Sequence, residues 1–143
     1  MKVTKMAAMA AVLSLACAGP LFAADASKDD MKADKQRIEA DAKAAKDKCK
    51  DMKGNAKDVC MAEARGHEKV AKAELALKQK DTAKNRYDVA AAKADMEYNV
   101  AKEKCDDMKG KEKDQCQKDA KAARDGAKKQ AKAERDAAGK AKK

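Results

Sequence analysis

The chain has 143 residues, enough for one ordinary domain, and carries a formal net charge of +10 with 42% charged residues. More than half of its hydrophobic residues are alanine and only 2% of all residues are aromatic, so the composition excludes a large globular core around a deep active site. Ala, Lys, Glu, Arg and Gln favour helices and β-branched residues are few, so we expect an all-α protein.

Residues 1–24 have the order of a secretory signal peptide. Two lysines come before an apolar run at 6–18, which is followed by a Gly-Pro helix break and small residues. We predict cleavage after Ala23 or Ala24 and a periplasmic or secreted location. The apolar run is shorter than the roughly 20 residues of a membrane span, and no later segment is long enough, so we expect no transmembrane span in the mature chain. Lipidation of Cys17 is an open alternative.

Residues 25–81 form the first predicted unit, a helical hairpin. Before Gly54, apolar residues recur at helical spacing: Met31, Ile38, Ala42, Ala45, Cys49 and Met52. A second stripe follows the glycine: Cys60, Ala64, His67, Ala71 and Leu75. We expect helices at about 28–53 and 56–80. Gly54 is expected to end the first helix in a left-handed conformation, and Asn55 is expected to cap the second.

Residues 82–143 form the second unit, a repeat of the first. The twelve-residue segment from Cys49 to Cys60 returns 56 residues later, from Cys105 to Cys116, with eight identical positions. We expect helices at about 82–109 and 112–132, joined at Gly110 and Lys111. The stripes of this unit are Tyr87, Ala94, Tyr98, Ala101, Cys105 and Met108, then Cys116, Ala120, Ala123 and Ala127. Because the last stripe has no large apolar residue, we expect a basic C-terminal tail that frays from about Asp125.

The spacing of the cysteines bears on how each unit folds. A straight helix would hold two Cα atoms eleven residues apart at roughly 16 Å, whereas a disulfide needs a Cα separation of about 4.4–6.8 Å. Either each unit folds back at its glycine or the cysteines pair between units. Four cysteines allow three pairings. We favour disulfides Cys49–Cys60 and Cys105–Cys116, because an exported chain meets an oxidising compartment and a bond across a short loop would stabilise a thin core.

No pattern for catalysis or for a cofactor is present. The chain has no Cys-x-x-Cys motif, no phosphate-binding glycine loop and one histidine, so we predict that it is not an enzyme and has no cofactor. Copper or zinc binding is one alternative, because Cys-x-x-Met occurs at Cys49–Met52 and Cys105–Met108. The other is binding of a polyanion or an anionic surface, such as lipopolysaccharide or phospholipid, through the lysine-rich helices. Nucleic acid is not expected as a partner, because no aromatic residues accompany the lysines and export removes the chain from the chromosome.

The doubled unit with Cys49, Gly54, Cys60, Cys105, Gly110 and Cys116 resembles small exported proteobacterial proteins that are often described as cell-envelope or TolA-like. The similarity to TolA itself is one of Lys/Ala-rich composition, so it does not imply a role in the Tol system. The resemblance implies a helical protein of the cell envelope. We therefore expect a non-catalytic structural or binding protein, whose partner is an envelope protein or an anionic envelope surface.

Overall fold

The computed structural model describes residues 28–141, which belong to the two predicted units. The predicted signal peptide, its cleavage site and Cys17 lie outside these residues. Four helices follow in chain order: α1 (Lys28–Cys49), α2 (Gly54–Gln79), α3 (Ala83–Cys105) and α4 (Gly110–Lys140). The described part contains no strand, so the predicted all-α fold is confirmed.

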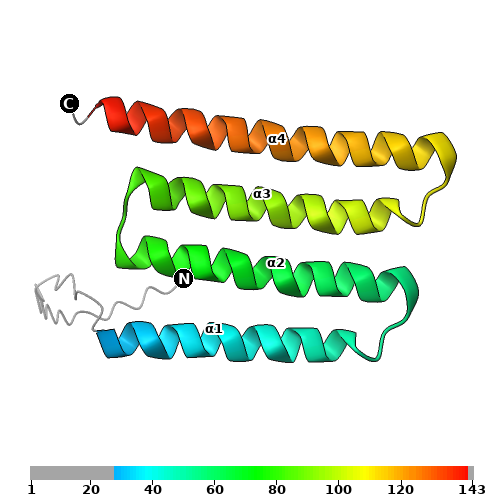
Figure 1. The fold of residues 1–143 in the computed structure, drawn as a ribbon, viewed down its shortest axis with the longest axis horizontal. Coiled ribbons are helices and arrows are strands. Elements are labelled where there is room, and N and C mark those ends of the chain that lie inside the picture. The colour runs from blue at the N-terminus through cyan, green and yellow to red at the C-terminus, as the bar shows by residue number, and fades with distance from the viewer. Residues whose placement is uncertain (1–27, 142–143) are drawn as a thin grey trace, which may run out of the picture.

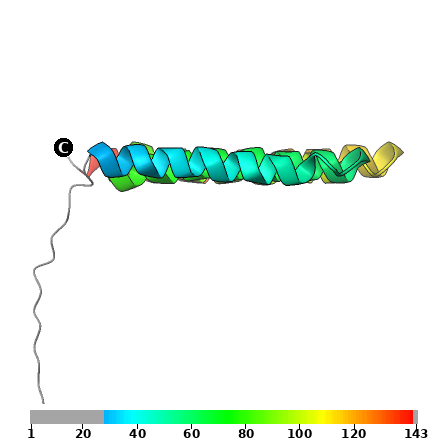
Figure 2. The same cartoon turned by 90° about the horizontal axis from the view of Figure 1, so that it is seen from below.

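The four helices lie side by side in one antiparallel layer. In Figure 1 they run back and forth in the order α1, α2, α3, α4. Seen along the layer in Figure 2 they overlap, so the layer is one helix thick. The inner helices α2 and α3 each pack against two neighbours, whereas α1 packs against α2 alone and α4 against α3 alone. Both broad sides of the layer are therefore open to solvent.

Both cysteine turns differ from the predicted glycine turn. The helices α1 and α3 end at Cys49 and Cys105, four residues before the expected ends. After α1, the Met52 amide donates a hydrogen bond to the Cys49 carbonyl (3.2 Å) and closes a turn. Gly54 has a φ of 57° as expected, yet it begins α2 instead of ending α1. Gly110 repeats this arrangement with a φ of 56°.

The predicted cap of α2 is wrong. Lys53 occupies the N-cap position in an extended conformation with no side-chain hydrogen bond, and Asn55 lies inside the helix. The Nδ2 of Asn55 is buried without a hydrogen-bond partner. In the second unit Lys109 takes the N-cap position, and Lys111 is exposed in the first turn of α4. The helix therefore starts two residues earlier than a side-chain cap at Asn55 would place it.

Small residues fill the interfaces within the hairpins. Ala42, Cys49 and Ala64 are buried between α1 and α2, and Ala94, Cys105 and Ala131 are buried between α3 and α4. The two methionines expected at the ends of the first stripes are 38% (Met52) and 43% (Met108) exposed. They leave the stripe because each helix has already ended at its cysteine.

Helix α4 is longer than predicted and uses a different stripe. It continues to Lys140 through the segment expected to fray, and Ala131 is buried. Ala123 and Ala127 of the predicted stripe are exposed. Two arginines face α3 instead: the Arg124 guanidinium lies 4.2 Å from the ring centroid of Tyr98, and that of Arg135 lies 4.9 Å from that of Tyr87. Their side chains supply the packing that the alanines were expected to supply.

The α2–α3 interface joins the two hairpins. Val70 and Val89 are buried there, and Gly66 packs so closely against Met96 that a Cβ at position 66 would lie 2.8 Å from the Met96 Cβ. Close approach of the two helices at this point therefore requires glycine.

The short connection between α2 and α3 is held by side-chain hydrogen bonds. Thr82 caps α3 by accepting from the Asn85 amide (3.0 Å), and Asn85 Nδ2 donates to the carbonyls of Ala76 and Lys80 at the end of α2. Arg86 forms a two-pronged pair with Asp81, both contacts at 2.6 Å. The chain breaks between the expected helices 56–80 and 82–109 as predicted, and these contacts tie the two hairpins together.

Candidate functional site

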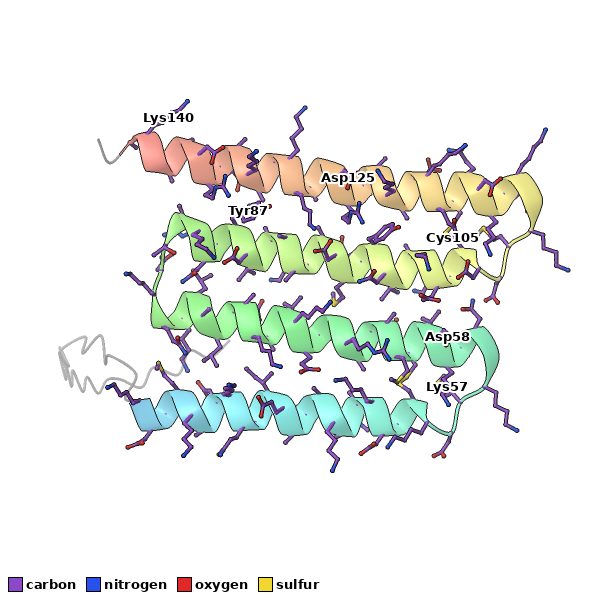
Figure 3. The ribbon with its side chains drawn as sticks, viewed as in Figure 1. Lys57, Asp58, Tyr87, Cys105, Asp125 and Lys140 are labelled. Atoms are coloured by element: carbon purple, nitrogen blue, oxygen red, sulfur yellow. A yellow bond between two sulfur atoms is a disulfide. The ribbon has the colours of Figure 1, made fainter. Side chains whose placement is uncertain are left out.

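The two cysteine turns are the features that the sequence singled out most clearly. Cys49 bonds to Cys60 and Cys105 bonds to Cys116, each with a Cα separation of 5.7 Å. The predicted pairing is therefore the one in the structure, and both disulfides lie at the same end of the layer. Figure 3 shows the second disulfide beside the labelled Cys105. The bonds between the two units that the spacing also allowed are absent from the described part of the chain.

Contacts around the two turns are similar but not identical. In the first, Lys57 Nζ donates to the Lys50 carbonyl at 3.3 Å. In the second, the equivalent Lys113 pairs with the carboxylate of Asp106 at 2.9 Å, and Gln117 donates to the same carboxylate. These contacts lower the pKa of Asp106. A lysine thus bridges each turn, which is a structural role.

Metal binding at the Cys-x-x-Met pairs does not fit this arrangement. A cysteine in a disulfide has no thiolate to offer a metal, and Cys49 and Cys105 are 1% and 0% exposed. His67 is exposed on α2. Within residues 28–141, no group of three or more His, Cys, Asp or Glu side chains is placed to hold an ion.

The carboxylates pair with basic side chains. Glu68 is the most strongly affected: hydrogen bonds from Lys46 of α1 and Lys72 of α2 lower its pKa to about 2. Asp34 accepts from Lys78 at 2.7 Å, and this pairing lowers its pKa. A carboxylate with a lowered pKa is ionised at neutral pH and is a poor proton donor, so these groups are suited to holding helices together.

The ion pairs between helices also show which side chains share a broad side of the layer. Glu68 and Glu74 are six residues apart on α2, a rotation of roughly 240°, so they project to opposite sides. Glu68 pairs with Lys46 of α1, and Glu74 pairs with Lys93 of α3. Asp95, two residues after Lys93, projects to the side of Glu68 and pairs with Lys128 of α4.

Basic residues gather on the Glu68 side of the first hairpin. Residues three or four positions apart along a helix share one side. Steps of this size from Lys46 along α1 and from Glu68 along α2 identify the basic residues on the Glu68 side. We call this set the lysine face: Lys28, Lys32, Lys35, Lys43, Lys46, Lys57, Arg65 and Lys72. Glu39, Asp58 and Glu68 are the acidic residues in the same rows. All members except Lys46 and Lys57 are exposed.

The opposite side of the first hairpin is more acidic. It carries Asp30, Asp34, Asp41, Glu63 and Glu74 together with Arg37, Lys48 and Lys78. The second hairpin mixes charges of both signs on each side. Within the first hairpin, the basic excess is therefore concentrated on one side. The sequence analysis missed this polarity because it followed the spacing of the apolar residues and not that of the charged ones. The signal was the spacing of the lysines at 28, 32, 35, 43 and 46.

The described helices include none that is long and apolar enough to cross a membrane. Comparisons of the chain with protein-family models, with curated proteins and with solved structures found no match. The resemblance to small envelope proteins therefore stays a prediction.

Proposed function

We propose that this chain is a non-catalytic structural or binding protein of the bacterial cell envelope, exported by its N-terminal segment. The observation that carries the proposal is the pair of disulfides, which close the two hairpins in the same way. Stable structural disulfides are typical of chains that leave the reducing cytosol. A thin, alanine-rich layer of this kind depends on them more than a protein with a large core does.

The chemistry of the described side chains supports a non-catalytic role. All four cysteines beyond residue 27 are in disulfides, so none is a nucleophile in the oxidised protein. Glu68, the carboxylate whose pKa is most strongly affected, is held by two lysines, which lower that pKa to about 2. What the layer offers is an extended, flat surface.

Peptide mass spectrometry without reduction tests this proposal. The full chain is expressed in a Gram-negative bacterium and purified from the periplasmic fraction, and we expect a mature N-terminus at Ala24 or Asp25 with both disulfides formed. The matched control lacks residues 2–24 and is expected to stay in the cytosol with free thiols. Retention of the full-length chain in the cytosol would overturn the proposal, as would free thiols in periplasmic protein.

A further inference from the structure

We propose that the lysine face docks flat on an anionic phospholipid bilayer, with its lysines meeting the headgroup phosphates. This inference deepens the proposed function by naming the partner, and it depends on export to the envelope. It is carried by the charge polarity of the first hairpin and by the flatness of the layer, which Figure 2 shows.

The exposed lysines of α1 are available to a partner. Lys28, Lys32, Lys35 and Lys43 have no ion-pair partner among the described residues, whereas Lys46 and Lys72 are held by Glu68. A lysine close to an anionic bilayer gains attraction from its surface potential. Free lysines add this attraction without first breaking an internal pair.

The shape of the layer matches a bilayer surface. Helix α1 has 22 residues, a length of roughly 33 Å at the usual rise, and its lysines form one row along it. A flat row of positive charges can contact a flat anionic surface along its whole length. The acidic opposite side would be repelled by the same surface, so the two sides together select one orientation.

The chemistry of the face favours adsorption over insertion. Its members are lysines and one arginine, and the two described tyrosines lie in the other hairpin beneath arginines of α4. Deep insertion needs an apolar side that this face lacks. Binding is therefore expected to depend on charge and to weaken as salt increases.

Cosedimentation with lipid vesicles tests the inference. The purified, disulfide-bonded protein is mixed with vesicles of phosphatidylglycerol and phosphatidylcholine, or of phosphatidylcholine alone, at low and moderate salt. We expect binding to the anionic vesicles that is lost at moderate salt. The triple variant Lys32→Gln, Lys35→Gln and Lys43→Gln should bind on the order of 100-fold more weakly, because each lysine near the surface contributes about one kilocalorie per mole of binding free energy.

The matched control removes the same charge elsewhere. Lys48→Gln, Lys104→Gln and Lys129→Gln change three exposed helical lysines outside the lysine face, and this variant should bind almost as well as the parent. Far-UV circular dichroism and melting show that each variant is folded. Equal loss in both variants would overturn the inference, because net charge alone would then explain binding. So would absence of binding to anionic vesicles, or tighter binding to duplex DNA at equal phosphate concentration. These outcomes leave the export and disulfide tests untouched, so the two proposals fail separately.

Discussion

Gly66 is the residue on which contact between the two hairpins depends most directly. A Cβ at this position would lie 2.8 Å from the Met96 Cβ and closer still to its Cγ. Because the Met96 Cβ is fixed to the backbone, a change of rotamer cannot relieve the clash and the helices must separate. We expect Gly66→Ala to lower the free energy of unfolding by roughly 1–3 kcal/mol, as overpacking does.

Gly126 provides the control for this substitution. It also lies inside a helix, but a Cβ there meets nothing within 4 Å. Gly126→Ala should raise the free energy of unfolding by roughly 0.5–1 kcal/mol, because alanine favours the helix. Urea titration of the two variants measures both effects. A stabilised Gly66→Ala protein would show that α2 and α3 do not approach each other this closely in solution.

Glu68 links stability to pH. Lys46 and Lys72 lower its pKa from 4.5 to about 2, so the folded state favours the ionised carboxylate. Its contribution is fully present above pH 4.5 and is lost as the pH falls from 4.5 towards 2. We expect Glu68→Gln to lower the free energy of unfolding by about 1 kcal/mol at pH 7, as expected for a partly exposed pair, and to have little effect near pH 2.

Glu63→Gln is a suitable comparison for this test, since Glu63 is exposed on the other side of α2 and has no ion-pair partner among the described residues. Thermal unfolding of both variants between pH 2 and pH 7 provides the measurement. An equal pH dependence in the two variants would mean that Glu68 is not held by its lysines in solution.

At the scale of the helices, the two disulfides are chemically alike but join different interfaces. The α1–α2 interface is lined largely by alanine around Ile38 and Leu75. In the α3–α4 interface, arginines cover Tyr87 and Tyr98. Each disulfide closes a short loop and is expected to contribute roughly 3 kcal/mol. The first hairpin has less other packing to keep it closed when its bond is removed.

We therefore expect Cys49→Ala with Cys60→Ala to reduce helix content more than Cys105→Ala with Cys116→Ala. The two double variants control for one another, because each removes one buried and one half-buried sulfur. Far-UV circular dichroism during urea titration follows the loss. If the second pair proved the more damaging, the arginine–tyrosine contacts would not stabilise α4 as argued.

The helices and their pairing within each unit were predictable, because they depend on local spacing. Alanine and lysine propensity, the repeated glycine and the eleven-residue cysteine spacing all lie within one unit. The long packed helix α4 was not predictable in the same way, since its contacts use Arg124 and Arg135, which a search for apolar residues passes over. The turn boundaries were wrong for a related reason. An extended Lys53 before Gly54 leaves no trace in hydrophobic periodicity.

For the whole molecule, the arrangement of the two hairpins was beyond the sequence argument. Val70, Val89, Gly66 and Asn85 make the α2–α3 contact, yet none belongs to the stripes that pair helices within a unit. A helix in this layer needs a second packing side only if it is an inner helix. This requirement arises only when the hairpins lie edge to edge. The same arrangement leaves both broad sides of the layer open, and the lysine face lies on one of them.

The single layer predicts a particular order of backbone protection. Helices α2 and α3 have neighbours on two sides, whereas α1 and α4 have one neighbour each (Figure 1). Local opening of an edge helix disrupts one interface, and opening of an inner helix disrupts two, so the free energy of opening should be larger for the inner pair. We expect hydrogen exchange, followed by mass spectrometry at neutral pH, to be slowest in α2 and α3. Exchange should be fastest in the part of α4 after Ala131, the last buried residue of that helix. In a closed four-helix bundle every helix has two neighbours, so equal protection of all four helices would contradict the layer.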